Sequence, residues 1–101
     1  MIVLRFKLQC RPEKTELVMA ALSDVIGPAR ETDGVISFDV ARDIADPNSL
    51  IAIEIFEDQG ARERQESLPQ VGKVMALLPE SIAAPPEATI YHVSASEPAI
   101  A

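Results

Sequence analysis

The chain has 101 residues, of which 48% are apolar and 25% are charged, a composition typical of one small folded domain. Nine basic and sixteen acidic side chains give a net charge of -7, which repels the phosphates of nucleic acids and of anionic membranes. No segment resembles a signal peptide or a membrane span. We therefore expect a cytoplasmic protein that has neither nucleic acid nor a membrane as a partner.

The chain has one cysteine, Cys10, and one histidine, His92. A single cysteine cannot form an internal disulfide, and these two residues do not provide the Cys/His spacing of a zinc site. We expect Cys10 to be a structural thiol and expect no metal site.

The first half of the chain predicts a strand, a helix and a hairpin. Residues 2–9 alternate in polarity, as in a strand, and residues 13–30 have the three-and-four apolar spacing of an amphipathic helix. Gly34 marks a turn, after which residues 35–42 and 50–57 alternate again across a polar loop.

The second half predicts two helices and a strand. Asp58 is a suitable cap for a short helix over residues 61–67, and a second helix is expected over residues 69–82. A proline pair ends the helical stretch before a last strand over residues 88–93.

This order of elements predicts an α+β, ferredoxin-like βαββαβ fold. Right-handed crossovers then place the helices on one face of a four-stranded antiparallel sheet. We expect this domain to cover residues 1–94 and to be followed by a flexible tail over residues 95–101.

Alternation along the strands predicts which face the helices cover. We expect the helix-covered face to carry the most apolar rows, namely Ile2, Leu4, Phe6, Leu8, Ile36, Phe38, Val40, Ile51, Ile53 and Ile55. The other face then mixes charged and apolar residues, chiefly Arg5, Lys7, Asp39, Glu54 and Phe56. A second copy of the chain would bury this face and pair its charges, so we favour a homodimer over a monomer.

The central segment resembles the antibiotic biosynthesis monooxygenase (ABM) domain family, which belongs to the dimeric α+β barrel superfamily. Its members share, in order, a glycine, an aromatic-Asp-Val strand, an Asp-Pro loop and a Glu-x-Trp-Glu-Asp segment. The corresponding residues here are Gly34, Phe38-Asp39-Val40, Asp46-Pro47 and Glu54-Ile55-Phe56-Glu57-Asp58. The resemblance covers about ninety residues and rests on the order of these motifs rather than on any one of them.

The resemblance implies a dimeric α+β barrel with a pocket between helices and sheet in each subunit. It also implies, as the best-known activity, oxygenation of polycyclic aromatic ketones without a metal or flavin, so we expect no cofactor. Other members degrade haem, or isomerise or process small signalling metabolites. The haem-degrading branch uses a tryptophan on the short helix, and this chain has no tryptophan.

The expected pocket is an apolar slot lined by Phe6, Phe38, Gln65 and Met75. Family members often carry a histidine on the short helix and another after the following proline. Here those positions are Gln65 and Gln70. Glutamine can orient a carbonyl or phenolate by hydrogen bonding but cannot act as a general base near neutral pH.

The identity of a proton acceptor stays open at the level of sequence. Gln65 is a hydrogen-bonding candidate, and His92 is the only imidazole, although a structural or surface role suits it better. Glu54 becomes a candidate if the interior of the dimeric barrel raises its pKa, but pairing with Arg5 or Lys7 across the sheet is its simpler role. The charged run from Arg62 to Glu66 is expected to be a solvated helix face.

These observations favour a cofactor-independent monooxygenase of the ABM type that acts on a small, apolar or aromatic, quinone-like metabolite. The alternatives are a non-catalytic dimeric module that binds a small molecule, and an isomerase or signal-processing enzyme of the same fold.

Overall fold

The computed structural model describes residues 1–100, and Ala101, the last residue of the expected tail, lies outside the described residues. The elements follow the order β1 (Ile2–Gln9), the 3-10 turn η1 (Pro12–Lys14), α1 (Thr15–Glu31), β2 (Val35–Arg42), β3 (Ser49–Phe56), α2 (Gln59–Glu66), α3 (Pro69–Ser81) and β4 (Glu87–His92). The strands pair antiparallel in the order β2-β3-β1-β4. The predicted ferredoxin-like α+β fold is therefore confirmed.

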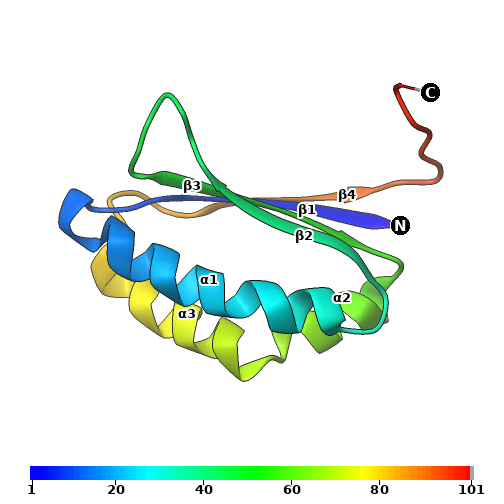
Figure 1. Cartoon of the computed structure of the whole chain (residues 1–101), viewed down its shortest axis with the longest axis horizontal. Helices are drawn as coiled ribbons and strands as arrows, with labels where there is room; N and C mark the ends of the chain where they lie inside the picture. Colours follow the sequence, from blue (N-terminus) through cyan, green and yellow to red (C-terminus); the bar gives the residue numbers. More distant parts are fainter. Residues whose placement is uncertain (101) are drawn as a thin grey trace.

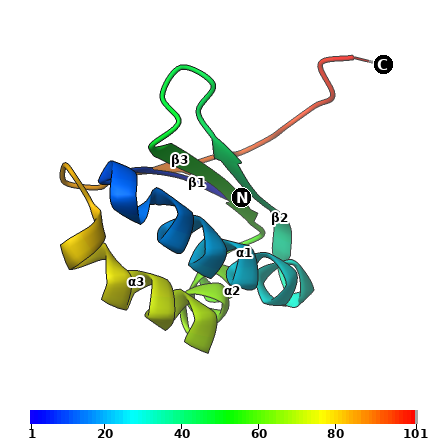
Figure 2. The same ribbon diagram turned by 60° about the vertical axis from the view of Figure 1, so that its left-hand side comes forward.

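The helices form a single layer on one face of the sheet, and no helix of residues 1–100 lies on the opposite face (Figure 1). Within this layer α3 packs against α1, while its backbone makes few contacts with the strands. Figure 2 shows α3 beneath α1 and at a distance from the sheet. Side chains of α3 and of strands β1 and β4 border a common cavity in this region.

The predicted faces are correct for β1 and wrong for β3. Register pairs Leu4 with Glu54 and Ile2 with Phe56, and paired residues point to the same face of a sheet. Glu54 and Phe56 are therefore buried beneath the helices, not on the open face where we expected them. The isoleucines of β3 lie on the open face instead, at positions Ile51, Ile53 and Ile55, and are partly exposed.

β2 contains a second departure from simple alternation. The register shifts between Val35 and Ser37, which leaves Ile36 52% exposed although we expected it beneath the helices. Beyond the shift Phe38 is buried in the core, as expected. Asp39 lies on the open face, as expected, but its carboxylate pairs with Arg30 of α1 at 3.1 Å, around the sheet edge.

Gly34 allows α2 to dock closely on the sheet. Its φ of 86° is in the left-handed region that favours glycine, and a Cβ there would lie 2.6 Å from the Cβ of Ala61. The carboxylate of Asp58 caps α2 by accepting a hydrogen bond from the amide of Ala61 at 2.9 Å, as predicted. The Arg64 guanidinium donates to the carbonyl of Asp33, which ties the helix to the same turn.

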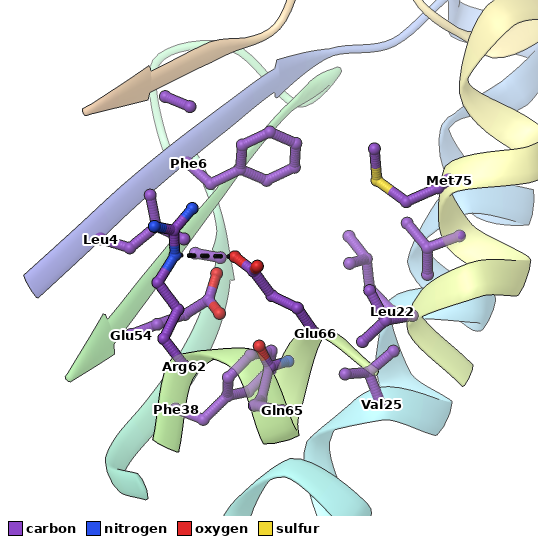
Figure 3. Close-up of a pocket in the computed structure, with 14 residues that line it drawn as sticks. Leu4, Phe6, Leu22, Val25, Phe38, Glu54, Arg62, Gln65, Glu66 and Met75 are labelled. Atoms are coloured by element: carbon purple, nitrogen blue, oxygen red, sulfur yellow. Dashed lines mark hydrogen bonds and ion pairs between the residues drawn. The ribbon is translucent and has the colours of Figure 1, made fainter. Parts of the chain in front are cut away.

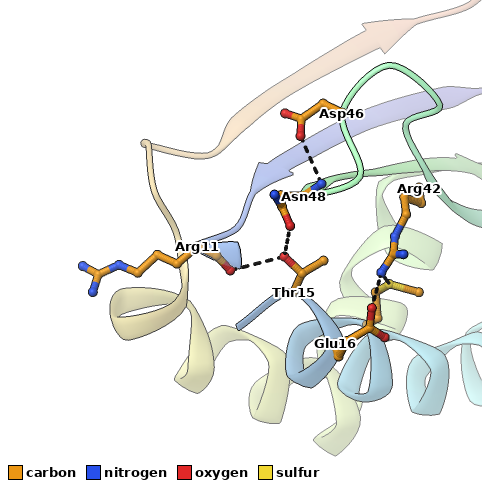
Figure 4. Close-up of polar contacts among 7 residues, drawn as sticks. Arg11, Thr15, Glu16, Arg42, Asp46 and Asn48 are labelled. Atoms are coloured by element: carbon orange, nitrogen blue, oxygen red, sulfur yellow. Dashed lines mark hydrogen bonds and ion pairs between the residues drawn. The ribbon is translucent and has the colours of Figure 1, made fainter. Parts of the chain in front are cut away.

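The loop between β2 and β3 is fixed to the start of α1 (Figure 4). The hydroxyl of Thr15 donates to the side-chain oxygen of Asn48 at 2.8 Å, and the amide of Asn48 donates to Asp46 at 3.0 Å. Arg42 of β2 pairs with Glu16 of α1 at 2.6 Å. These contacts hold the β2–β3 loop against the start of α1, at the end of the sheet away from α2 (Figure 1).

No helix formed by residues 1–100 is both long and apolar enough to cross a lipid bilayer.

Candidate active site

A cavity of about 350 Å³ lies between the sheet and the helices. Its wall consists of Leu4, Phe6, Leu22, Val25, Phe38, Ala52, Glu54, Arg62, Gln65, Glu66, Val71, Val74, Met75 and Ala88. Most of these side chains are apolar, and the polar ones come from β3 and α2 (Figure 3). An apolar cavity of this size with a few polar groups on one side is typical of a small-molecule site.

Glu54 is the carboxylate at the sheet side of this cavity. It is only 6% exposed and lies on an inner strand, between Leu4 of β1 and Phe38 of β2. Burial in these apolar surroundings, with the negative charge of Glu66 nearby, raises its pKa from 4.5 to about 7, and Arg62 opposes this rise. Glu54 can therefore both accept and release a proton near neutral pH.

The expected pairing of Glu54 with Arg5 or Lys7 does not occur. Both cations lie on the open face, since Arg5 pairs in register with Ile53 and Lys7 with Ile51. Strand alternation points Glu54 to the opposite side.

Arg62 and Glu66 line the cavity, although we expected this charged run to be a solvated helix face. They are one turn apart on α2 and form a salt bridge of 2.9 Å, with side-chain exposures of 23% and 40%. Glu63 and Arg64 are exposed, as expected. The missed signal is the four-residue spacing of Arg62 and Glu66 beside Gln65, which places all three on neighbouring faces of a short helix.

Gln65 projects from α2 into the cavity wall. It follows Ala61 by four residues, and Ala61 packs against Phe56 and Ile2, so the same helix face continues into the cavity. Gln65 is 2% exposed, and its side-chain oxygen has no hydrogen-bond partner among residues 1–100. Phe6, Phe38 and Met75, the other residues expected in the pocket, also line this cavity.

The remaining candidates lie elsewhere. His92 is exposed at the end of β4, opposite Ile2, and does not line the cavity. Gln70, at the start of α3, is also absent from its lining. Cys10 is buried, and burial raises its pKa, which keeps the thiol protonated. Within the described part of the chain no three His, Cys, Asp or Glu side chains form a group that could hold a metal ion.

The arrangement suits proton transfer in an apolar slot. Glu54 can take a proton from an acidic C–H or O–H of a bound molecule, and the positive charge of Arg62 would stabilise the resulting anion. The aromatic rings of Phe6 and Phe38 provide flat surfaces for a ring system.

Comparison with known proteins agrees with the resemblance of the motifs. A sequence model of the family described as "Antibiotic biosynthesis monooxygenase" matches residues 1–77, about three quarters of the chain. The chain belongs to this family. The ABM match includes all of β1 to α2 and most of α3, and so nearly the whole cavity wall.

Solved structures of similar shape share the fold at low sequence identity. A Deinococcus radiodurans protein named after the ABM family is 19% identical, with a TM-score of 0.87 and full coverage of both chains. A Nitrosomonas europaea protein named after it is 17% identical, with a TM-score of 0.86 over 94% of this chain and all of that one.

One curated relative also matches in sequence. An uncharacterised protein of Synechocystis is 25% identical over 96 residues, which is 95% of this chain. The chain spans 65% of the length of that relative.

Proposed function

We propose that this ABM-family protein is a cofactor-independent monooxygenase that acts on a small, flat, aromatic or quinone-like metabolite. The observation that carries the proposal is Glu54, a buried carboxylate with a pKa near 7 inside a largely apolar cavity. Membership of the family supports the reaction type. The residue types at the site support its first step.

In that step Glu54 removes a proton from the ligand, leaving an electron-rich carbanion or phenolate beside Arg62. Such an anion can reduce O2 directly. For an anthrone, one oxygen atom becomes the new ring carbonyl of the quinone and the other leaves as water with the two hydrogens of the original methylene group. Glu54 then returns its proton to the peroxide that the ligand forms with O2, so that water can leave, and its pKa near 7 permits this return. A ring system that fills the apolar part of the cavity would displace water from beside the anion.

A homodimer is part of the proposal. The open face of the sheet displays a row of partly exposed isoleucines, Ile51, Ile53 and Ile55, that a second copy could bury. Arg5 and Lys7 lie on the same face and could meet acidic groups of that copy.

The test is oxygen uptake by the purified protein with a panel of anthrones and hydroquinones. We expect at least one compound to be consumed above its rate without protein, and the variant Glu54→Gln to lose about 100-fold or more of that rate. Glu57→Gln is the matched control, because Glu57 is exposed and lies outside the cavity.

Uptake at the rate without protein across the panel would overturn the oxygenase proposal. Thermal stabilisation by the same compounds would then favour the non-catalytic binding module. Oxygen-independent exchange of ligand C–H for deuterium, lost in Glu54→Gln, would favour the isomerase.

A further inference from the structure

Two buried glutamine oxygens in this protein lack hydrogen-bond partners. They are the side-chain oxygens of Gln65 and Gln70, and neither receives a donor from residues 1–100. A buried acceptor without a partner destabilises a folded protein, because it has lost its bonds to water without replacing them. Of these two residues, Gln65 lines the cavity and Gln70 lies outside it, so Gln65 is the one that a bound molecule would border.

The cavity wall does not supply the missing donor. Its charged groups are Glu54, Glu66 and Arg62, and the Nε of Arg62 already donates to Glu66 at 2.9 Å. The remaining lining residues are apolar. Figure 3 shows Gln65 on α2, on the same side of the cavity as Glu54 and Arg62 and away from Met75. None of these groups donates to Gln65, and a ligand that carries a hydroxyl group can supply the donor.

We propose that Gln65 is a specificity-determining residue whose carbonyl oxygen accepts a hydrogen bond from a hydroxyl group of the ligand. The hydroxyl lies toward α2, and the apolar ring of the ligand lies toward Phe6 and Met75. This inference rests on the proposed function in one respect, that the cavity is the ligand site. It does not depend on which reaction takes place there.

Discrimination follows from the burial of Gln65. A ring that carries a hydroxyl satisfies the buried oxygen, whereas the same ring with a methoxy group brings only a second acceptor and leaves it unsatisfied. Sites built to hydrogen-bond a ligand hydroxyl reject analogues that lack it much more strongly than apolar pockets distinguish a missing methylene. We expect a preference of about tenfold or more for the hydroxyl compound.

The experiment measures binding of 2-naphthol and 2-methoxynaphthalene by calorimetry, without any requirement for oxygen. The wild-type protein should bind 2-naphthol about tenfold more tightly. Gln65→Met, which keeps the side-chain length and removes the amide, should lose this preference without losing affinity for 2-methoxynaphthalene. Gln65→Leu provides a second variant should the first fail to fold.

Gln70→Met is the matched control. This substitution also removes an unpartnered buried oxygen, so Gln65→Met and Gln70→Met should both be at least as stable to heat as the wild type. Gln70 lies outside the cavity, so Gln70→Met should keep the preference for 2-naphthol. Equal binding of the two probes by the wild type, binding of neither, or a preference that survives in both Gln65 variants would overturn the inference. Failure of oxygen uptake alone would overturn the reaction and leave the role of Gln65 in place.

Discussion

The buried position of Glu54 lowers the stability of the folded protein when the carboxylate is charged. A charged carboxylate in apolar surroundings is penalised by lost hydration, and the neighbouring Glu66 adds repulsion that Arg62 offsets only in part. A leucine or methionine there would avoid this penalty. The position of Glu54 is therefore more readily explained by proton transfer in the cavity than by stability.

The raised pKa makes stability depend on pH in a defined window. In the unfolded chain Glu54 ionises near 4.5, whereas in the folded protein it keeps its proton until about pH 7. The folded state therefore holds more protons between these values, and its free energy of unfolding falls as pH rises through the window. Below pH 4.5 Glu54 is protonated in both states, so its burial costs no stability through ionisation. Above pH 7 it is ionised in both states, and the loss of stability has reached its full size.

We expect Glu54→Gln to remove this dependence. Relative to the wild type, the variant should gain stability between pH 4.5 and 7, up to roughly 3 kcal/mol, since each pH unit contributes about 1.4 kcal/mol. Denaturant unfolding at pH 4 to 8 measures the difference, with Glu57→Gln as the control. A difference that does not change with pH would show that Glu54 ionises normally.

At the scale of elements, α2 brings three of the four polar side chains, Arg62, Gln65 and Glu66, to the cavity. It is eight residues long, and it presents Ala61 to the core, Gln65 to the cavity and Arg62 beside it. Its position depends on the close approach at Gly34, where the turn before β2 leaves no room for a Cβ.

Gly34→Ala should displace α2. The added methyl would meet the Cβ of Ala61 at 2.6 Å and would occupy a backbone conformation with φ of 86°, so we expect a loss of about 2 to 4 kcal/mol in the free energy of unfolding. Gly72→Ala in α3 is the control, because a Cβ there meets nothing within 4 Å and alanine favours a helix by about 1 kcal/mol. A Gly34→Ala protein as stable as the wild type would contradict this role.

Sequence pattern predicts the elements well because each has a clear period and clear ends. It fails on the faces of β3, where Leu50, Ala52 and Phe56 alternate with isoleucines and both rows are apolar. The isoleucine row is the more apolar, and Glu54 interrupts the other, so the pattern favours the wrong face. The register between β3 and β1 decides which row faces the helices, and a strand's own sequence does not contain that register.

The same reasoning explains the candidate site. Alternation places Phe6 and Phe38 in the cavity and helical spacing places Met75 there, whereas the resemblance to the ABM family points to Gln65. Arg62 and Glu66 were missed because charged residues on a short helix are usually solvated. Conflicts between local pattern and structure are expected at functional sites, and both the Glu54 and Arg62 positions line the cavity.

At the scale of the whole molecule, one face of the sheet is covered by helices and the other is open (Figure 1). The helices bury one face, while the isoleucines of β3 remain partly exposed on the other. We expect light scattering after size-exclusion chromatography to give twice the mass of one chain. Ile53→Lys, in the middle of that face, should give a single chain because burying a lysine there opposes association.

Leu17→Lys is the control for this prediction. Leu17 is 46% exposed on α1, in the helix layer, so a lysine there leaves the open face unchanged. A wild-type protein with the mass of one chain would contradict the proposed dimer.

Labelling with 18O2 tests the proposed reaction most directly. An anthrone incubated with the wild-type protein and a metal chelator should yield a quinone that carries one 18O atom, faster than without protein. Glu57→Gln should do the same, and Glu54→Gln should form labelled product no faster than the uncatalysed reaction. Equal rates of labelled product with the wild type and Glu54→Gln, or no rate above the uncatalysed one with the wild type, would contradict an oxygenase that depends on Glu54.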